Sequence, residues 1–408
     1  MSYTQKTLVG FSWQTIYKAI LVGIAMIKMY FLARLLDPQA FGLFSLTAIT
    51  LGITESLTQT GINVTILQSK QSVKSFIDTA WVVAIIRGFV IGIIMLLMGL
   101  FMQNFYQEPQ LLILIAVATL VPIIKGFINP YIVILHKEMR FFQDSLYRFS
   151  LIFVESLAAV ILGFLTHSVW SLVFALIIGA IYEVVISFIF FKLKPKFNYL
   201  PSKGKIILNN AKWLSLSTVF NYLNENVDDF ILGKIFGTHA LGIYHNSYAL
   251  SHKANYDFSK SVHHSTLPAF TRLTDSSLRL QRAFYRSMLA LIALISFASL
   301  PLIIFPGFFV KLILGSQWLE VIPLVRPLIF AGIVQSISNQ SYALFLARKQ
   351  YKILNLHLFS SLVLMIILLI WWGNSYQLLG AVYGILVSRL IALPLILVGI
   401  LHKTHDKK

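Results

Sequence analysis

The sequence contains no cysteine and only a small share of charged residues. The absence of cysteine excludes disulfide bonds and thiolate metal sites. Charged residues make up 12% of the 408 positions, whereas about 25% are charged in an ordinary soluble domain. Hydrophobic residues make up 57%, more than the chain can bury against itself. The composition therefore predicts a membrane protein in which lipid covers many apolar side chains.

Other absences narrow the class of function. The sequence has no Gly-x-x-x-x-Gly-Lys-Ser/Thr loop, so we expect no ATP-driven step in this chain. His263 and His264 are adjacent, whereas histidine ligands on a helix recur at i, i+4. We therefore predict no metal and no cofactor. The net charge is +18, but the basic residues lie in short loops between apolar runs, which is typical of membrane proteins and not of nucleic-acid-binding proteins.

The apolar runs predict an all-α membrane protein, because a helix needs about 20 residues to cross the hydrocarbon core. Twelve transmembrane helices are expected, at residues 10–33, 40–61, 77–102, 111–135, 145–167, 168–191, 207–233, 240–261, 286–308, 322–347, 354–372 and 377–401. The second and eighth windows are unusually polar. Pro122 and Pro130 are expected to loosen the backbone of the fourth.

The basic residues predict how these helices are oriented. Most of them fall in the segments that lie inside if the N-terminus is cytoplasmic, whereas the outside segments carry only Arg34, Lys234, Lys311 and Arg326. The positive-inside rule therefore predicts a multi-pass protein of the cell membrane (inner or plasma membrane) with both termini in the cytoplasm. Within the inside segment 262–285, an amphipathic run with several arginines is expected to form a helix on the inner headgroups.

Two segments indicate an internal repeat. ARLLDPQAFGLF at 33–44 follows the first predicted helix, and GKIFGTHALGIY at 233–244 follows the seventh at an offset of 200 residues. Since each half has an even number of helices, the repeat is parallel. We predict an N-terminal six-helix lobe at 1–191, a basic cytoplasmic linker at 192–206 and a C-terminal six-helix lobe at 207–408. Transporters with such repeats bind substrate between the halves and work by alternating access.

Basic residues also lie deep inside the predicted helices. A charge at the bilayer centre costs about 2.5–3.5 kcal/mol on insertion scales, so each needs a wet cavity, a partner or a route to the interface. We predict a cationic cavity that binds an anionic substrate, formed by Lys18, Arg87, Lys125, Asn129, Lys253 and Arg389. Salt bridges and hydrogen bonds that only hold the helices together are the alternative for each residue.

Acidic and amide side chains follow helical spacing on the seventh and eighth predicted helices. Asn221, Glu225 and Asp228 lie at i, i+4 and i+7, and Lys253 and Asp257 form an i, i+4 pair. A carboxylate in a low-dielectric site can exchange its proton. We predict that Asn221, Glu225, Asp228 and Asp257 bind a coupling H⁺ or Na⁺ or take part in gating. A conformational or structural role is the alternative.

Several short segments resemble a known family in their order and spacing. The segments include Ala33-Arg34-Leu35-Leu36, Thr79-Ala80-Trp81, Leu135-His136-Lys137-Glu138-Met139-Arg140-Phe141, Ser168-Val169-Trp170-Ser171-Leu172, Leu241-Gly242-Ile243-Tyr244 and Leu267-Pro268-Ala269-Phe270-Thr271-Arg272. With these segments the chain is similar to the polysaccharide exporters and oligosaccharide-lipid flippases of the MOP superfamily, which is related to MATE transporters, and above all to the colanic-acid and teichuronic-acid exporter branch.

The resemblance implies a MATE/MOP-like fold of two pseudo-symmetric six-helix lobes. It implies that the chain flips undecaprenyl-diphosphate-linked sugar repeat units from the cytoplasmic to the outer leaflet during synthesis of O-antigen, capsule or exopolysaccharide, usually coupled to an ion gradient. The implied partners are the lipid-linked oligosaccharide, the bilayer and a polysaccharide polymerase. Many of these exporters have fourteen spans, and in the superfamily's lipid flippases the two extra helices help to form the lipid-tail groove.

Two other functions stay open. A MATE-like drug or cation antiporter predicts an acidic cavity, whereas the deep charges here are more often basic. A polytopic envelope-polysaccharide enzyme needs catalytic side chains on a sizeable outer loop, and no predicted outer segment is long. We therefore predict a transporter and not an enzyme, with a flippase as the favoured function.

Overall fold

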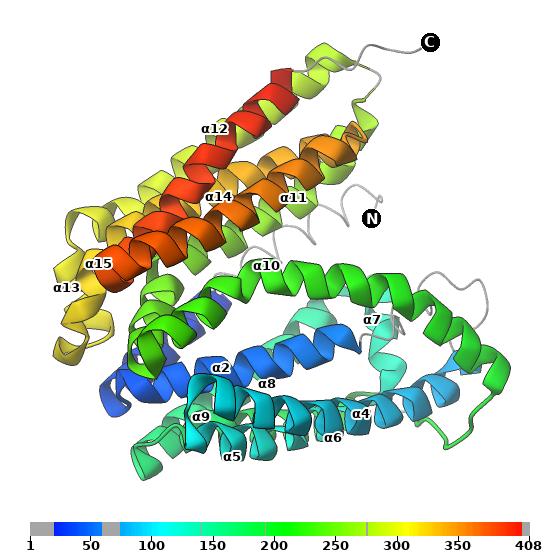
Figure 1. Ribbon diagram of the computed structural model, residues 1–408. Helices are drawn as coiled ribbons and strands as arrows, with labels where there is room; N and C mark the ends of the chain where they lie inside the picture. The colour runs from blue at the N-terminus through cyan, green and yellow to red at the C-terminus, as the bar shows by residue number, and fades with distance from the viewer. Residues whose placement is uncertain (1–19, 59–73, 139, 192, 275, 402–408) are drawn as a thin grey trace. The chain divides into compact units, whose positions relative to one another are not determined.

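The computed structural model describes residues 20–58, 74–138, 140–191, 193–274 and 276–401, and these residues are mostly helical with no strand (Figure 1). Seven of the described helices are long and apolar enough to cross a membrane. One of these, Tyr351–Ile400, has non-helical backbone angles at Tyr376 and Gln377 and so contains two of the predicted spans. Each of the twelve predicted windows overlaps a helical segment. The prediction of an all-α membrane protein is confirmed.

The chain forms two compact units, Met1–Lys234 and Ile235–Lys408. The boundary lies inside α10 (Pro201–Tyr248), close to Gly237, whose φ of 80° and ψ of 176° interrupt the helix. Between α9 and α10, most of the residues are not helical. The lobes at 1–191 and 207–408 and the linker at 192–206 stay a prediction, since the division into compact units falls later in the chain.

The first unit is built from short and long helices packed around α4 and α9. Helix α8 packs against α9 across a turn at His167, and α4 packs against α5 and α6. The helices of this unit before α10 are residues 20–35, α2 (Pro38–Leu57), α4 (Lys74–Tyr106), α5 (Pro109–Ala118), α6 (Leu120–Lys125), η1 (Pro130–Ile132), α7 (Val133–Lys137), α8 (Phe141–Thr166) and α9 (Trp170–Phe190).

The fourth predicted span is broken, as its prolines led us to expect. Helix α5 ends at Ala118, α6 ends at Lys125, and the 3₁₀ helix η1 starts at Pro130. Proline removes a backbone donor, so other groups must satisfy the freed carbonyls. Trp81 on α4 donates from Nε1 to the Phe127 carbonyl at 3.2 Å. The break places Lys125 at a helix end instead of within a continuous helix.

The polar second span satisfies its own hydroxyl groups. Thr47, Thr50 and Thr54 are buried, and each donates to the carbonyl four residues earlier at 2.9, 2.8 and 2.9 Å. A hydroxyl bonded in this way does not need water or a partner helix. This explains how α2 can be polar in sequence and still be buried in the first unit.

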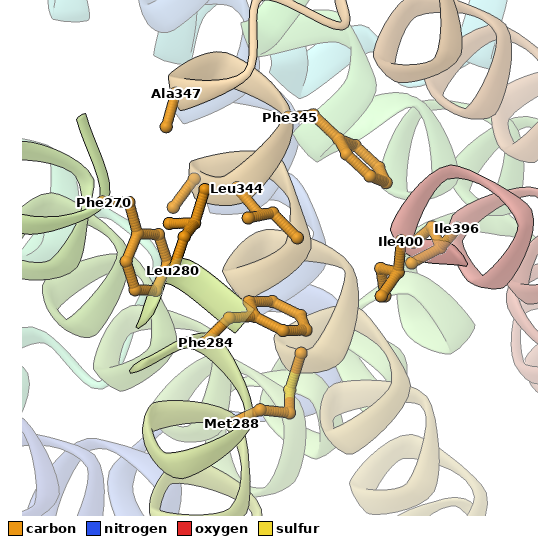
Figure 2. Packing of buried hydrophobic residues seen from close by; sticks show 10 residues of the cluster. Phe270, Leu280, Phe284, Met288, Leu344, Phe345, Ala347, Ile396 and Ile400 are labelled. Atoms are coloured by element: carbon orange, nitrogen blue, oxygen red, sulfur yellow. The ribbon is translucent and has the colours of Figure 1, made fainter. Parts of the chain in front are cut away.

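In the second unit, α14 is the central helix. It packs against η2, α11, α12, α13, η3 and α15. Figure 2 shows a buried apolar cluster in which Phe270, Phe284, Phe345 and Ile396 come from four different helices. The elements after Gly237 and the end of α10 are the π-helix η2 (Ala249–Lys253), α11 (Ala254–Arg272), α12 (Ser277–Ile304), α13 (Pro306–Ile313), η3 (Ser316–Val321), α14 (Ile322–Ala347) and α15 (Tyr351–Leu401).

The predicted headgroup helix within 262–285 is wrong. The arginine-bearing run forms the first turns of α12, which continues without a break from Ser277 to Ile304. Leu280 and Phe284 are buried in the apolar cluster of the second unit. Because the same apolar face runs on into the ninth predicted span, the run packs against protein instead of lying flat on the membrane.

Candidate functional site

The structure describes the side chains of some predicted site residues but not of others. Lys18 lies outside the described residues, and so do the side chains of Asn221, Lys253 and Asp257. The remaining predicted residues divide between the two units. Arg87, Lys125, Asn129, Glu225 and Asp228 belong to the first unit, and Arg389 belongs to the second.

Arg87 on α4 binds the end of α2. Its Nε donates to the Thr58 carbonyl at 2.8 Å, and its Nη2 donates to the Glu55 carbonyl at 3.0 Å. It also interacts electrostatically with the Glu55 carboxylate. A cation at a helix C-terminus stabilises the partial negative charge of the unpaired carbonyls. Nη1 makes no hydrogen bond to a described residue.

Lys125 has an acidic neighbour that the sequence did not indicate as its partner. Glu183 on α9 interacts electrostatically with Lys125 at the end of α6 and with Arg148 on α8. Arg148 also forms a salt bridge with Asp144, one turn earlier on α8, at 3.0 Å. Each basic group at this place therefore has a carboxylate within electrostatic range.

A second ion pair links the first helix to α8. The Lys28 Nζ lies 3.1 Å from the Glu155 carboxylate, and the side chains are 25% and 33% exposed. Gly179 on α9 leaves room for the acidic partner, because a Cβ there would lie 3.3 Å from the Cβ and Cγ of Glu155. The pair is thus held where α9 comes close to α8.

These groups form one set, which we call the N-terminal charged cluster. Its members come from six helices of the first unit, and the acidic ones interact with one another as well as with the cations. The cluster consists of Lys28, Glu55, Arg87, Lys125, Arg148, Glu155 and Glu183. It mixes both signs of charge, so the excess of basic groups expected from the sequence is small among the described residues. A lone carboxylate in an apolar span is a functional-site signal, and Glu183 is the only charged residue of α9.

Asn129 has a different role from the charged residues. Its side chain accepts from the Tyr131 N–H at 3.1 Å and donates to the Leu193 carbonyl at 2.9 Å. Its backbone N–H donates to the Ser187 hydroxyl at 3.0 Å, and the residue is fully buried. These bonds fix the broken fourth span against the end of α9. They favour the structural alternative for Asn129.

The acidic residues of α10 lie in different environments. Asp228 is buried with 4% of its surface exposed, whereas Glu225 is exposed. Tyr106 at the end of α4 donates to the Phe230 carbonyl at 2.9 Å and so ties this stretch of α10 to the first unit. Of the two carboxylates, only Asp228 has the low-dielectric surroundings that favour ion or proton exchange.

Arg389 on α15 lies in the second unit, apart in sequence from the N-terminal charged cluster. Its Nη1 donates to the Nε2 atom of His252 and to the Ala331 carbonyl, the latter at 3.2 Å. His252 is buried in the π-helix η2. Sequence reasoning did not single out this histidine, because it stands in a polar stretch with many other possible hydrogen-bonding groups.

Comparison with known proteins identifies the family. Residues 31–323 match the polysaccharide biosynthesis protein family. The chain belongs to this family. It is 24% identical over 404 residues to the lipopolysaccharide biosynthesis protein WzxC of Escherichia coli (strain K12), covering 96% of this chain and 80% of WzxC. It is 20% identical over 351 residues to the teichuronic acid biosynthesis protein TuaB of Bacillus subtilis (strain 168), covering 85% of this chain and 72% of TuaB.

Solved structures share the fold of this family member. A structure of the lipid II flippase MurJ in an inward closed conformation aligns with a TM-score of 0.72 at 13% identity, over 95% of this chain and 87% of that one. An inward-facing MATE family multidrug resistance transporter of the MOP superfamily aligns with a TM-score of 0.57 at 14% identity, over 93% and 92% of the two chains. The predicted MATE/MOP-like fold is confirmed.

Proposed function

We propose that this chain is a flippase that moves undecaprenyl-diphosphate-linked oligosaccharide repeat units from the cytoplasmic to the outer leaflet of the cell membrane by alternating access. Its partners in this proposal are the lipid-linked oligosaccharide, the bilayer and a polysaccharide polymerase. Membership of the polysaccharide biosynthesis protein family supports it. So do the relatives named for lipopolysaccharide and teichuronic acid biosynthesis and the fold shared with a lipid II flippase.

The N-terminal charged cluster is the observation that carries the proposal. Charges within a membrane-spanning bundle are costly, so a set drawn from six helices indicates a site for a polar ligand. Guanidinium and ammonium groups bind phosphate through charge-assisted hydrogen bonds, and Nη1 of Arg87 makes no hydrogen bond to a described residue. Carboxylates such as Glu183 accept hydrogen bonds from sugar hydroxyls. A mixed-charge site therefore suits a ligand that carries both a diphosphate and sugars.

The pairing of charges also gives a reason for ion coupling. When a diphosphate binds Arg87 and Lys125, it competes with Glu55 and Glu183 for the same cations. A carboxylate that loses its cation in a low-dielectric site gains affinity for H⁺ or Na⁺. Binding of the coupling ion would then depend on whether substrate is present. Asp228, buried on α10, is our candidate for the coupling site, with Asn221, Glu225 and Asp257 as the other predicted positions.

Complementation tests the substrate role of the cluster. In a host that lacks its own exporter of this kind, we expect Arg87→Gln and Lys125→Gln to reduce surface polysaccharide at least tenfold, with normal amounts of protein in the membrane. Arg87→Lys keeps the positive charge but changes the hydrogen bonds to the end of α2, so it separates the effect of the charge from the effect of this contact. Arg140→Gln, at an exposed arginine paired with Glu138, is the matched control and should export normally. Wild-type polysaccharide in both cluster variants would contradict the proposal.

A second function, a cation or drug antiporter, is favoured by the three carboxylates of the cluster. Such a transporter binds its cation through acidic side chains, and the carboxylates of Glu155 and Glu183 are close enough to interact electrostatically. Proteoliposomes separate the two functions. The flippase proposal expects transfer of a lipid-linked oligosaccharide and no uptake of a cationic dye, whereas the antiporter expects the reverse.

Vesicles with controlled gradients test the coupling ion. The proton gradient and the sodium gradient are collapsed in separate experiments. We expect transfer of lipid-linked oligosaccharide to slow in one of these experiments and to be unchanged in the other. Asp228→Asn should remove this dependence, whereas Glu320→Gln, at an exposed carboxylate outside the predicted coupling positions, should keep it. Transfer that is insensitive to both gradients would exclude ion-driven transport.

A further inference from the structure

Arg389 is a cation of the second unit whose contacts are neutral. It is half-buried on α15, and among the described residues it bonds only to His252 and to the Ala331 carbonyl. Both bonds use Nη1, so Nε and Nη2 make no hydrogen bond to a described residue. No described carboxylate forms a salt bridge with this guanidinium. Because an unpaired charge in a membrane bundle is costly, neutral acceptors must set its position.

The bond between these two side chains fixes the tautomer of the histidine. Arginine can only donate hydrogen bonds, so Nε2 of His252 must present its lone pair. The imidazole is therefore neutral, with its proton on Nδ1. Nδ1 is buried and has no hydrogen-bond partner among the described residues. An unpaired buried donor is unfavourable. The imidazole nevertheless carries its proton on the unpaired Nδ1, because Nε2 accepts the hydrogen bond from Arg389.

The ring of His252 is held by its surroundings and not by Arg389 alone. It stacks on Tyr248 with ring centroids 4.3 Å apart and an interplanar angle of 24°. It belongs to a π-helical turn, a widened turn that is frequent at functional sites. Gly332 on α14 leaves room for it, because a Cβ there would lie 3.3 Å from the Cα and O atoms of His252. These contacts restrict the position of the imidazole independently of its bond to Arg389.

We propose that His252 is a positioning residue, which holds the Arg389 guanidinium so that its Nε and Nη2 edge binds the phosphate or carboxylate of the anionic substrate. This inference rests on the proposed function. With Nη1 fixed by His252 and Ala331, the two remaining nitrogens form a fork for bidentate binding of an oxyanion. A lysine has no such second edge, so the arrangement requires arginine.

The test uses the full-length protein in proteoliposomes, with initial rates of transfer measured over a range of lipid-linked oligosaccharide densities. His252→Phe keeps a stacking ring but removes the acceptor, and His252→Gln offers an acceptor again. We expect His252→Phe to raise the apparent KM by about tenfold, since misplaced binding groups weaken binding, and to change kcat much less. His252→Gln should recover most of the loss. His357→Phe, at another buried histidine that contacts a backbone carbonyl, is the control.

A double-mutant comparison separates positioning from a general structural role. In an Arg389→Gln background, His252→Phe should have no further effect on KM. A further loss in that background would overturn the proposal, and so would equal losses of thermal stability and transport in His252→Phe and His357→Phe. Normal KM in His252→Phe while Arg389→Gln is defective would overturn it as well. Normal transfer by Arg389→Gln would instead reject Arg389 as a substrate-binding residue.

Discussion

Gly88 sets how closely α4 and α6 approach one another. A Cβ at this position would lie 2.5 Å from the Pro122 carbonyl oxygen, so the backbone would have to shift. We expect Gly88→Ala to lower the thermal midpoint of the purified protein, because overpacking lowers the free energy of unfolding by about 1–3 kcal/mol. Transport should also fall, because Arg87 and Lys125 lie next to this contact in sequence.

The matched control for Gly88→Ala is Gly307→Ala on α13. The nearest atom to a Cβ there is the Cδ1 of Ile322 at 3.7 Å, an ordinary contact. Alanine also has a higher helix propensity than glycine. Gly307→Ala should therefore leave the midpoint unchanged or raise it slightly, and equal losses in the two variants would argue against the close contact at Gly88.

The ion pair of Lys28 and Glu155 gives a second prediction at this scale. Glu155→Gln leaves a cation unpaired in a half-buried place, so we expect loss of thermal stability and transport. The double variant Lys28→Gln and Glu155→Gln should recover part of both. The coupling between the two changes is expected at about 0.5–3 kcal/mol, as for other residues in direct contact. If the two losses simply add, the salt bridge contributes nothing beyond its separate side chains.

Single residues show where prediction from sequence reached its limit. Arg87 and Lys125 could be identified as deep charges because burial of a charge is costly on any helix. Their partners Glu55 and Glu183 could not be assigned, since which helices meet depends on tertiary packing. Asn129 looked like a cavity residue because it is polar inside a span. Its bonds to backbone groups on both sides of the break are visible only in three dimensions.

At the scale of helices, the polar eighth span is explained by its contacts with neighbouring helices. Asn255 on α11 donates to the Ser299 hydroxyl of α12 at 3.0 Å. Asn339 on α14 donates to the Ser259 hydroxyl of α11 at the same distance. Farther along, Gln340 donates to Thr266 at 3.2 Å. Hydrogen bonds of this kind join membrane helices where apolar packing alone gives little preference. The sequence indicated a polar helix, but not that α14 pairs with it.

The bond between α14 and α11 can be tested at Asn339. Asn339→Leu removes the donor to Ser259 and should lower stability by about 1–2 kcal/mol, the upper range for hydrogen bonds between membrane helices. Asn355→Leu on α15 makes the same change at an exposed position and should have little effect. Thermal midpoints of the two purified variants provide the measurement. Equal midpoints would mean that the bond from Asn339 to Ser259 adds nothing to the stability of the contact between α11 and α14.

At the scale of the whole chain, the repeat is visible in where helices break. Asp37, with extended backbone angles, precedes α2 and caps it by accepting from the Ala40 N–H at 2.8 Å. Gly237, 200 positions later, interrupts α10 with a positive φ. After each break, the equivalent residues Leu43 and Ile243 are buried. The short sequence repeat thus coincides with a break in the helical backbone at both places, formed by a capped turn at Asp37 and by a glycine of positive φ at position 237.

The orientation of the chain in the membrane is the last prediction. Because the chain has no cysteine, a single introduced cysteine reports on one position without other changes. Lys205→Cys at the exposed start of α10 should react with an impermeant maleimide only after the membrane is opened, since the positive-inside rule places this basic region in the cytoplasm. Lys311→Cys on α13 is exposed and should react in intact cells. The opposite pattern would invert the orientation, and labelling of both from one side would mean that the number of crossings between them is even.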